Sequence, residues 1–241
     1  MMPIVHRVDS IATVSPLLSS LFSADISTSE SRVVGTPALL REDELTAAVA
    51  FAPRRIEEFA AGRDCARRAL SGAGGPWASI ARREDRSPQW PLGFTGSITH
   101  IAGFCGAVAA ATTAYVSIGI DAERTNRLII DVWDHVFTAR ELDDLKPLAS
   151  DLRNRTAIVK YSAKEAFYKC QWPITHQWID FEEVEINVRF EGDLFGSFEI
   201  LPQSIACQIR FGTCDLRGRF AFDPEGFVVT GIAAHRGSYG W

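Results

Sequence analysis

The feature that most constrains the fold is an uncharged run of twenty residues, Ile101–Ile120. Its length would let a helix cross a bilayer, so a membrane span is the first alternative. The run is rich in Ala, Gly, Ser and Thr, however, and it lies between His100 and Asp121. Two buried strands, near 104–111 and 115–121, explain it better. We therefore expect a protein that is not inserted in a membrane.

The second of these strands ends in two carboxylates, Asp121 and Glu123. Alternate residues of a strand share a face, so both acids and Gly119 should point away from the core. The opposite, core-facing side should consist of Val116, Ile118 and Ile120. Paired acids at a strand end are often only solvated. Together with a ligand-accessible Gly119 they also suit Mg²⁺, the cation of phosphoryl chemistry.

A third candidate acid lies on a helix expected over about 151–170 and stopped by Trp172-Pro173. Glu165 and Lys169 are four residues apart, a spacing that also stabilises ordinary exposed helices. The functional alternative makes Glu165 a metal ligand or general base, with Lys164 and Lys169 holding phosphate oxygens.

Another helix is expected to begin at Pro53 and run to about Leu70. Arg63 falls on its apolar stripe, where a guanidinium needs an anionic partner. That partner is either a protein carboxylate or a bound anion, and the sequence leaves both open. Gly62 beside it indicates close packing or the approach of a ligand.

Composition limits the class of protein. The net charge of −5 over 241 residues gives no general attraction to nucleic acid or to an anionic membrane. Five cysteines without a Cys-x-x-Cys spacing fit a reduced, cytoplasmic protein without structural zinc. The stretch Met1–Asp9 lacks the long apolar core of a signal peptide.

Further elements follow from local patterns. A capping box at Thr138 and Glu141 predicts a short helix, and Asp223–Gly226 predicts a turn. A helix is expected around 42–50, and strands around 94–100, 184–190, 198–201, 205–211, 220–222 and 227–233.

Taken in order, these segments resemble the 4'-phosphopantetheinyl transferases, of the enterobactin synthetase component D type. The matching motifs are Arg55…Glu58-Phe-Ala-Ala-Gly-Arg63-Asp-Cys-Ala-Arg67, Arg86…Pro88…Trp90-Pro91, Gly96-Ser-Ile-Thr-His100, Ile118-Gly-Ile-Asp121-Ala-Glu123 and Ser162-Ala-Lys-Glu165-Ala-Phe-Tyr-Lys169. The resemblance covers about Arg54 to Cys170 and is weak outside that range.

The resemblance implies an α+β fold and a monomer. Its two similar α/β halves, 1–114 and 115–241, would be related by pseudo-twofold symmetry, with coenzyme A bound in the cleft between them. Asp121, Glu123 and Glu165 would bind Mg²⁺ at the pyrophosphate. Nucleotide contacts would come from Arg55, Arg63, Thr99 and His100, with Arg82, Arg83 and Arg86 near the adenine and Lys164 and Lys169 on the phosphates.

The implied reaction transfers phosphopantetheine from coenzyme A to a serine of an apo acyl or peptidyl carrier protein. Glu165 would take the serine proton, directly or through a metal-bound water, and 3',5'-adenosine bisphosphate would leave. The carrier could belong to siderophore or other nonribosomal peptide, polyketide or fatty-acid synthesis. A non-catalytic coenzyme A-binding module and a Mg²⁺-dependent phosphohydrolase are the alternatives.

Overall fold

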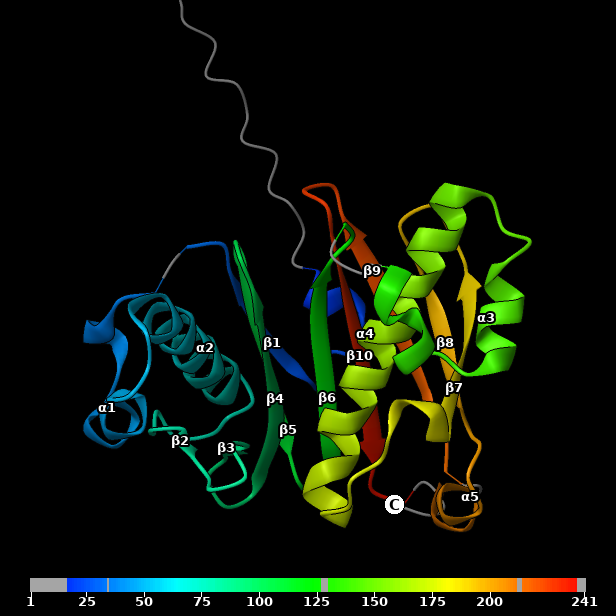
Figure 1. Cartoon of the computed structure of the whole chain (residues 1–241). Coiled ribbons are helices and arrows are strands. Elements are labelled where there is room, and N and C mark those ends of the chain that lie inside the picture. The colour runs from blue at the N-terminus through cyan, green and yellow to red at the C-terminus, as the bar shows by residue number, and fades with distance from the viewer. Residues whose placement is uncertain (1–16, 34, 127–129, 212–213, 238–241) are drawn as a thin grey trace, which may run out of the picture.

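The computed structural model describes residues 17–33, 35–126, 130–211 and 214–237 (Figure 1). The Met1–Asp9 stretch, on which the absence of a signal peptide was predicted, lies outside these residues. The helices are α1 (Glu42–Ala48), α2 (Pro53–Gly72), α3 (Ala139–Leu145), α4 (Ser150–Thr175) and α5 (Ile205–Phe211). Short 3-10 turns lie at Leu18–Ser20, Pro37–Leu39, Ile130–His135 and Phe181–Glu183.

The strands form two main antiparallel sheets and a short hairpin. One sheet has the order β1 (Ser27–Ser31), β5 (Phe104–Ala111), β4 (Phe94–Ile101). The other has the order β6 (Tyr115–Arg124), β10 (Phe227–His235), β9 (Arg217–Asp223), β8 (Phe195–Pro202), β7 (Val184–Phe190). The hairpin pairs β2 (Ala81–Arg82) with β3 (Pro88–Gln89). The α+β class expected from the sequence is confirmed.

Each main sheet packs against one long helix (Figure 1). Helix α2 contacts β1, β4 and β5, whereas α4 contacts β6, β10 and β7. The two sheets meet where β4 contacts β6, and there the Ser97 hydroxyl accepts a hydrogen bond from the Ile120 amide at 3.1 Å. The division at residues 114 and 115 stays a prediction, but the turn between β5 and β6 lies at this point.

One hydrophobic cluster joins the two main sheets. Leu18, from the segment before β1, packs in the same cluster as Phe104 of β5, Ile118 of β6 and Val229 of β10, and all four are buried. Burying apolar surface from both sheets in one cluster couples their stabilities. The two main sheets therefore share part of their core.

Strand β6 departs from simple alternation near its start. Tyr115 pairs with His235 and Ser117 pairs with Ala234, so Val116 is an extra residue in a β-bulge. Val116 consequently packs with the cluster of α4, whereas Ile118 and Ile120 lie in the cluster that joins the sheets. The prediction that Val116 shares their face was wrong.

Two element predictions also need correction. Residues 205–211 form α5 instead of a strand, because Ser204 caps the helix by accepting the Cys207 amide at 3.1 Å. Helix α4 continues through Pro173 to Thr175. A proline in the last turn removes only one backbone donor, and the helix then ends at His176 in the left-handed conformation.

The two strands expected from the uncharged run are confirmed as β5 and β6. Within the described residues, the structure contains no helix with the length and apolar character that crossing a membrane requires.

Candidate functional site

A cavity of about 700 Å³ lies between β4, β6, α4 and the tip of the β2–β3 hairpin. Segments distant in the chain thus face one space. The predicted site residues that line it are Arg55, Arg83, Arg86, Thr99, His100, Asp121, Glu123, Glu165 and Lys169. All the carboxylates expected from the sequence therefore reach the same cavity.

Asp121 is the buried carboxylate of this cavity, with 5% of its surface exposed. Its Oδ1 accepts hydrogen bonds from Lys169 Nζ at 2.6 Å and Thr99 Oγ1 at 3.4 Å. Its Oδ2 accepts from Ser162 Oγ at 2.8 Å. Asp121 and Lys169 therefore form an ion pair at the wall of the cavity.

Glu165 lies one helical turn before Lys169 and is half-buried. Burial raises the pKa of its carboxyl group above the ordinary value, Lys169 opposes this rise and Asp121 adds to it. A higher pKa makes the carboxylate a better proton acceptor once it is ionised.

His100 lies at the end of β4 with Arg55 and Glu58 of α2. Its Nε2 contacts Arg55 Nη1 and is 3.4 Å from Glu58 Oε2. Burial, followed by the charge of Arg55, lowers the pKa of His100 to about 4. The ring is therefore neutral at pH 7, and the ion pair of this corner is formed by Arg55 and Glu58, whose nitrogen and oxygen are 3.3 Å apart.

The structure does not bring Lys164 to the large cavity. Its ammonium group is buried and donates to Glu141 Oε2 at 2.6 Å, Phe181 O at 2.7 Å and Val136 O at 2.9 Å. These three acceptors satisfy its three donors. A contact between Lys164 and a phosphate would require breaking them.

Two of the predicted arginines also lie elsewhere. The Arg63 guanidinium is 4.2 Å from the centre of the Phe59 ring, and burial lowers its pKa to about 10. Its Nε is buried without a hydrogen-bond partner. The Arg82 guanidinium lies 5.5 Å from the centre of the Phe51 ring. Neither residue lines the large cavity.

The glycines that suggested ligand approach serve packing instead. A Cβ at Gly119 would overlap the backbone carbonyl of Ala166, because α4 crosses β6 there. A Cβ at Gly62 would press on the Ile98 side chain of β4 at 3.2 Å. Both positions let a helix approach a strand closely.

The described residues contain no group of three or more His, Cys, Asp or Glu side chains arranged to hold a metal ion. The ammonium of Lys169 bonds to Asp121, where a cation would otherwise bind. The magnesium site therefore stays a prediction.

Sequence reasoning missed the contacts that connect the hairpin tip to α4. Trp172 Nε1 donates to Asp85 Oδ2 at 2.8 Å, across the cavity that both residues line. Hydrogen bonds from Ser87 and then from Trp172 lower the pKa of Asp85 to about 2. The only sequence signal was an aromatic residue beside Pro173, which was interpreted as a helix stop.

A second cavity of about 230 Å³ adjoins the first. Both cavities are lined by Glu165 and Tyr168. Lys164, Trp178 and Phe181 are among the residues that line only the smaller one. Tyr168 and Trp178 pack edge to face with ring centres 5.4 Å apart. A polar cavity and a largely apolar one thus meet at Glu165.

Comparison with known proteins matches two family models. Residues 41–110 match the 4'-phosphopantetheinyl transferase N-terminal domain, and residues 117–221 match the 4'-phosphopantetheinyl transferase superfamily.

Three curated relatives carry the name 4'-phosphopantetheinyl transferase. Svp of Streptomyces mobaraensis is 34% identical over 199 residues, which cover 81% of this chain and 78% of Svp. Npt of Nocardia iowensis is 39% identical over 57% of this chain, and PptT of Mycobacterium tuberculosis is 38% identical over 59%. The matched regions span 61% of Npt and 62% of PptT. The chain belongs to the 4'-phosphopantetheinyl transferase superfamily.

Proposed function

We propose that this protein transfers the phosphopantetheine arm of coenzyme A to a serine of an apo acyl or peptidyl carrier protein. The observation that carries the proposal is the convergence of Asp121, Glu123, Glu165 and Lys169 on one cavity between two sheets. Carboxylates beside basic groups are what phosphoryl transfer requires. The names of the relatives support the same activity.

The two adjoining cavities match the two parts of coenzyme A. Arg55, Arg83 and Arg86 of the larger cavity offer cationic groups to its phosphates. The aromatic lining of the smaller cavity suits the less polar pantetheine arm. The bond that breaks lies between these parts, so the reacting phosphorus belongs where the cavities meet, at Glu165.

In the proposed reaction, the carrier serine oxygen bonds to the β-phosphorus of coenzyme A. The bond from that phosphorus to the bridging oxygen breaks, and 3',5'-adenosine bisphosphate leaves. Glu165 accepts the serine proton, a role that its raised pKa favours. Lys169, held at 2.6 Å from Asp121, places a positive charge near the diphosphate.

Asp121, Glu123 and Glu165 are also the residues that would hold Mg²⁺. Their oxygen donors line one cavity and are of the type that this ion prefers. Bound there, the ion would offset negative charge on the diphosphate.

Incubation with coenzyme A, Mg²⁺ and an apo carrier protein tests the function by intact-mass analysis. The expected result is a carrier that gains one phosphopantetheine and a carrier with serine replaced by alanine that gains none. Unchanged coenzyme A would favour a binding module, and hydrolysed coenzyme A would favour a phosphohydrolase. Carriers from peptide, polyketide and fatty-acid synthesis would identify the partner class.

Glu165→Gln tests the proton acceptor. We expect binding of coenzyme A with Mg²⁺ to persist, whereas turnover should fall by about 10²- to 10⁴-fold because the amide cannot accept the proton. Titration calorimetry and carrier modification measure the two effects. Glu199→Gln, the same change at an exposed position of β8, should leave both unchanged. Near-normal turnover of Glu165→Gln would exclude Glu165 from the chemistry.

A further inference from the structure

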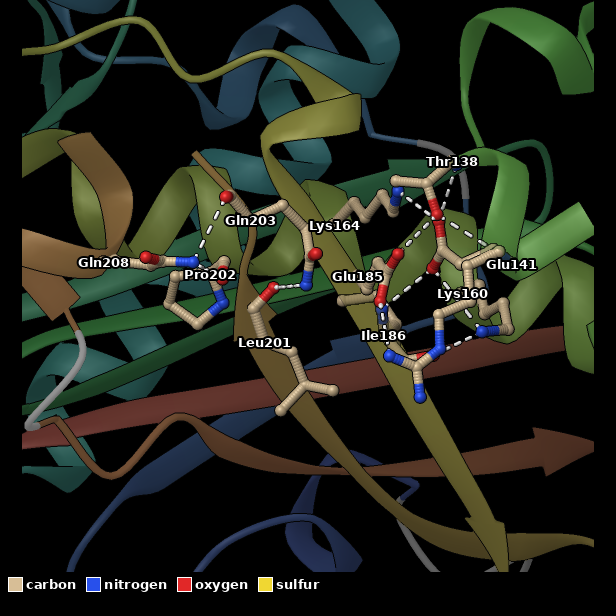
Figure 2. A network of polar contacts seen from close by, with 11 residues as sticks. Thr138, Glu141, Lys160, Lys164, Glu185, Ile186, Leu201, Pro202, Gln203 and Gln208 are labelled. Atoms are coloured by element: carbon tan, nitrogen blue, oxygen red, sulfur yellow. Dashed lines mark hydrogen bonds and ion pairs between the residues drawn. The ribbon is translucent and has the colours of Figure 1, made fainter. Parts of the chain in front are cut away.

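A buried group of charges lies beside the candidate site, and we call it the Glu141 cluster (Figure 2). It consists of Thr138, Glu141, Lys160, Lys164 and Glu185. Glu141 and Lys164 are each 2% exposed or less. Sequence reasoning had identified Glu141 only as the third residue of a capping box. In the structure, its carboxylate joins α3 to α4 and β7.

Glu141 receives donors from four directions. Its Oε1 accepts the Ile186 amide at 2.8 Å and lies 3.5 Å from Lys160 Nζ. Its Oε2 accepts Lys164 Nζ at 2.6 Å and the Thr138 amide at 3.1 Å. A carboxylate that is satisfied in this way has one low-energy position.

The two lysines of the cluster belong to one face of α4. Lys160 and Lys164 are four residues apart, and both ammonium groups bond to segments outside the helix. Glu165 follows Lys164 directly, so it lies about 100° further around the helix axis. Because both residues belong to the same helix, holding Lys164 in place also sets the direction in which the Glu165 side chain points.

Each acid of the cluster has its own cationic partner. Glu141 pairs with the buried Lys160 and Lys164, whereas Glu185 lies 3.9 Å from the exposed Arg140. Thr138 Oγ1 donates to Glu185 at 2.8 Å and also accepts the Glu141 amide at 3.2 Å. Removing one member leaves a buried charge without its partner. Helix α4 is then expected to shift so that this charge reaches solvent or another group of opposite charge.

We propose that Glu141 and Lys164 are positioning residues that hold α4 in the rotation that directs Glu165 into the cavity. This inference rests on the proposed transferase function. It replaces the sequence-based expectation that Lys164 contacts the phosphates of coenzyme A. Glu141 lines neither cavity and acts through Glu165. Lys164 borders the smaller cavity, but its ammonium group is held by Val136, Glu141 and Phe181, so it too acts through Glu165.

The test compares Glu141→Gln, Lys164→Met and the double variant. In each, kcat for carrier modification should fall by about 10- to 100-fold, because small displacements of a reacting group are costly. The dissociation constant of coenzyme A should stay within about threefold, since Glu141 lines neither cavity and the Lys164 ammonium group is held by protein oxygens. The double variant should lose no more activity than the worse single variant, because one interaction is lost in all three.

Lys146→Met is the matched control. Lys146 is an exposed lysine at the end of α3 whose ammonium is 2.6 Å from Asp143 at the surface. The Lys146→Met variant should retain the wild-type kcat and the wild-type affinity for coenzyme A. Circular dichroism at the assay temperature establishes that each variant is folded.

Thr138→Val is the milder variant if Glu141→Gln does not fold. It keeps the side-chain shape and deletes the hydroxyl that contacts Glu185 and caps α3. We expect kcat to fall by about threefold while the dissociation constant of coenzyme A stays unchanged.

Two results would overturn the proposal. A higher coenzyme A dissociation constant for Lys164→Met alone would mean that Lys164 binds the phosphates. Lower thermal stability with unchanged kcat would mean that the cluster only stabilises the fold. Hydrogen exchange needs no turnover, and amides around Glu165 should exchange faster in Glu141→Gln than in Lys146→Met. If the wild-type protein modifies no carrier but the two variants still differ in exchange, the transferase function is refuted and the positioning role remains.

Discussion

At the scale of single residues, charge placement decides which groups can act. Asp121 is held by Lys169, Ser162 and Thr99, so it contributes a fixed negative charge to the cavity. Glu165 has a pKa raised mainly by burial, which makes its carboxylate a better proton acceptor once it is ionised. His100 is kept neutral by burial and by Arg55.

His100 leads to a prediction for stability. Its pKa is about 4 in the folded protein against an ordinary value of 6.5, so between these pH values only the unfolded chain takes up the proton. The free energy of unfolding should therefore fall as the pH is lowered through this window. His100→Gln should remove roughly 1–2 kcal/mol of that loss. Urea denaturation at pH 7.5, 5.5 and 4.5 measures the free energy of unfolding of the wild type and of His100→Gln. The same dependence on pH in both proteins would contradict the prediction.

At the scale of elements, caps and helix ends explain both the agreements and the errors. Thr138 and Glu141 cap α3 as the sequence pattern predicts. The apolar residues of 205–211 were interpreted as a strand, although Cys207 and Phe211, four apart, form the buried face of α5. Ser204 before them is the cap that identifies the helix.

Ser204→Ala should therefore weaken α5. The Cys207 amide would lose its acceptor, and the free energy of unfolding should fall by about 1 kcal/mol. Chemical denaturation measures the change. Ser71→Ala, at an exposed position near the end of α2, serves as the control and should stay within about 0.5 kcal/mol of wild type. Equal stability of the two variants would argue against the cap.

At the scale of the whole molecule, the two sheets are connected by more than the chain. Arg32, just after β1, pairs with Asp223 at 2.7 Å and with Glu225 at 3.0 Å. Its guanidinium also lies 5.2 Å from the Phe104 ring centre and 4.6 Å from that of Phe227. Together with the cluster around Leu18, these contacts join the sheet of β1, β4 and β5 to the sheet that contains β9 and β10.

Arg32→Met tests this connection. The Asp223 side chain is 1% exposed and would lose its cationic partner. We expect a loss of about 2 kcal/mol, below the usual cost for a buried pair because Arg32 is partly exposed. Fluorescence and circular dichroism during urea denaturation should still report a single transition. Arg68→Met, which removes an exposed pair with Asp64, should change stability by under about 0.5 kcal/mol.

Much of the candidate site could be predicted because it depends on local spacing. The alternation of β6 places Asp121 and Glu123 on one face of the strand, and the helical pattern places Glu165 and Lys169 one turn apart. The direction of Lys164 could not be predicted in this way. Its partners Val136, Glu141 and Phe181 come from three other segments.

The amino-acid order by itself determined the α+β class, most element positions and the set of acids in the cavity. These depend on periodicity and caps, which act over a few residues. Tertiary structure alone decided that Gly119 receives α4 and that Lys164 is held by Glu141. The physical reason is that a buried side chain takes the partners that distant segments bring to it, and no local pattern encodes their identity.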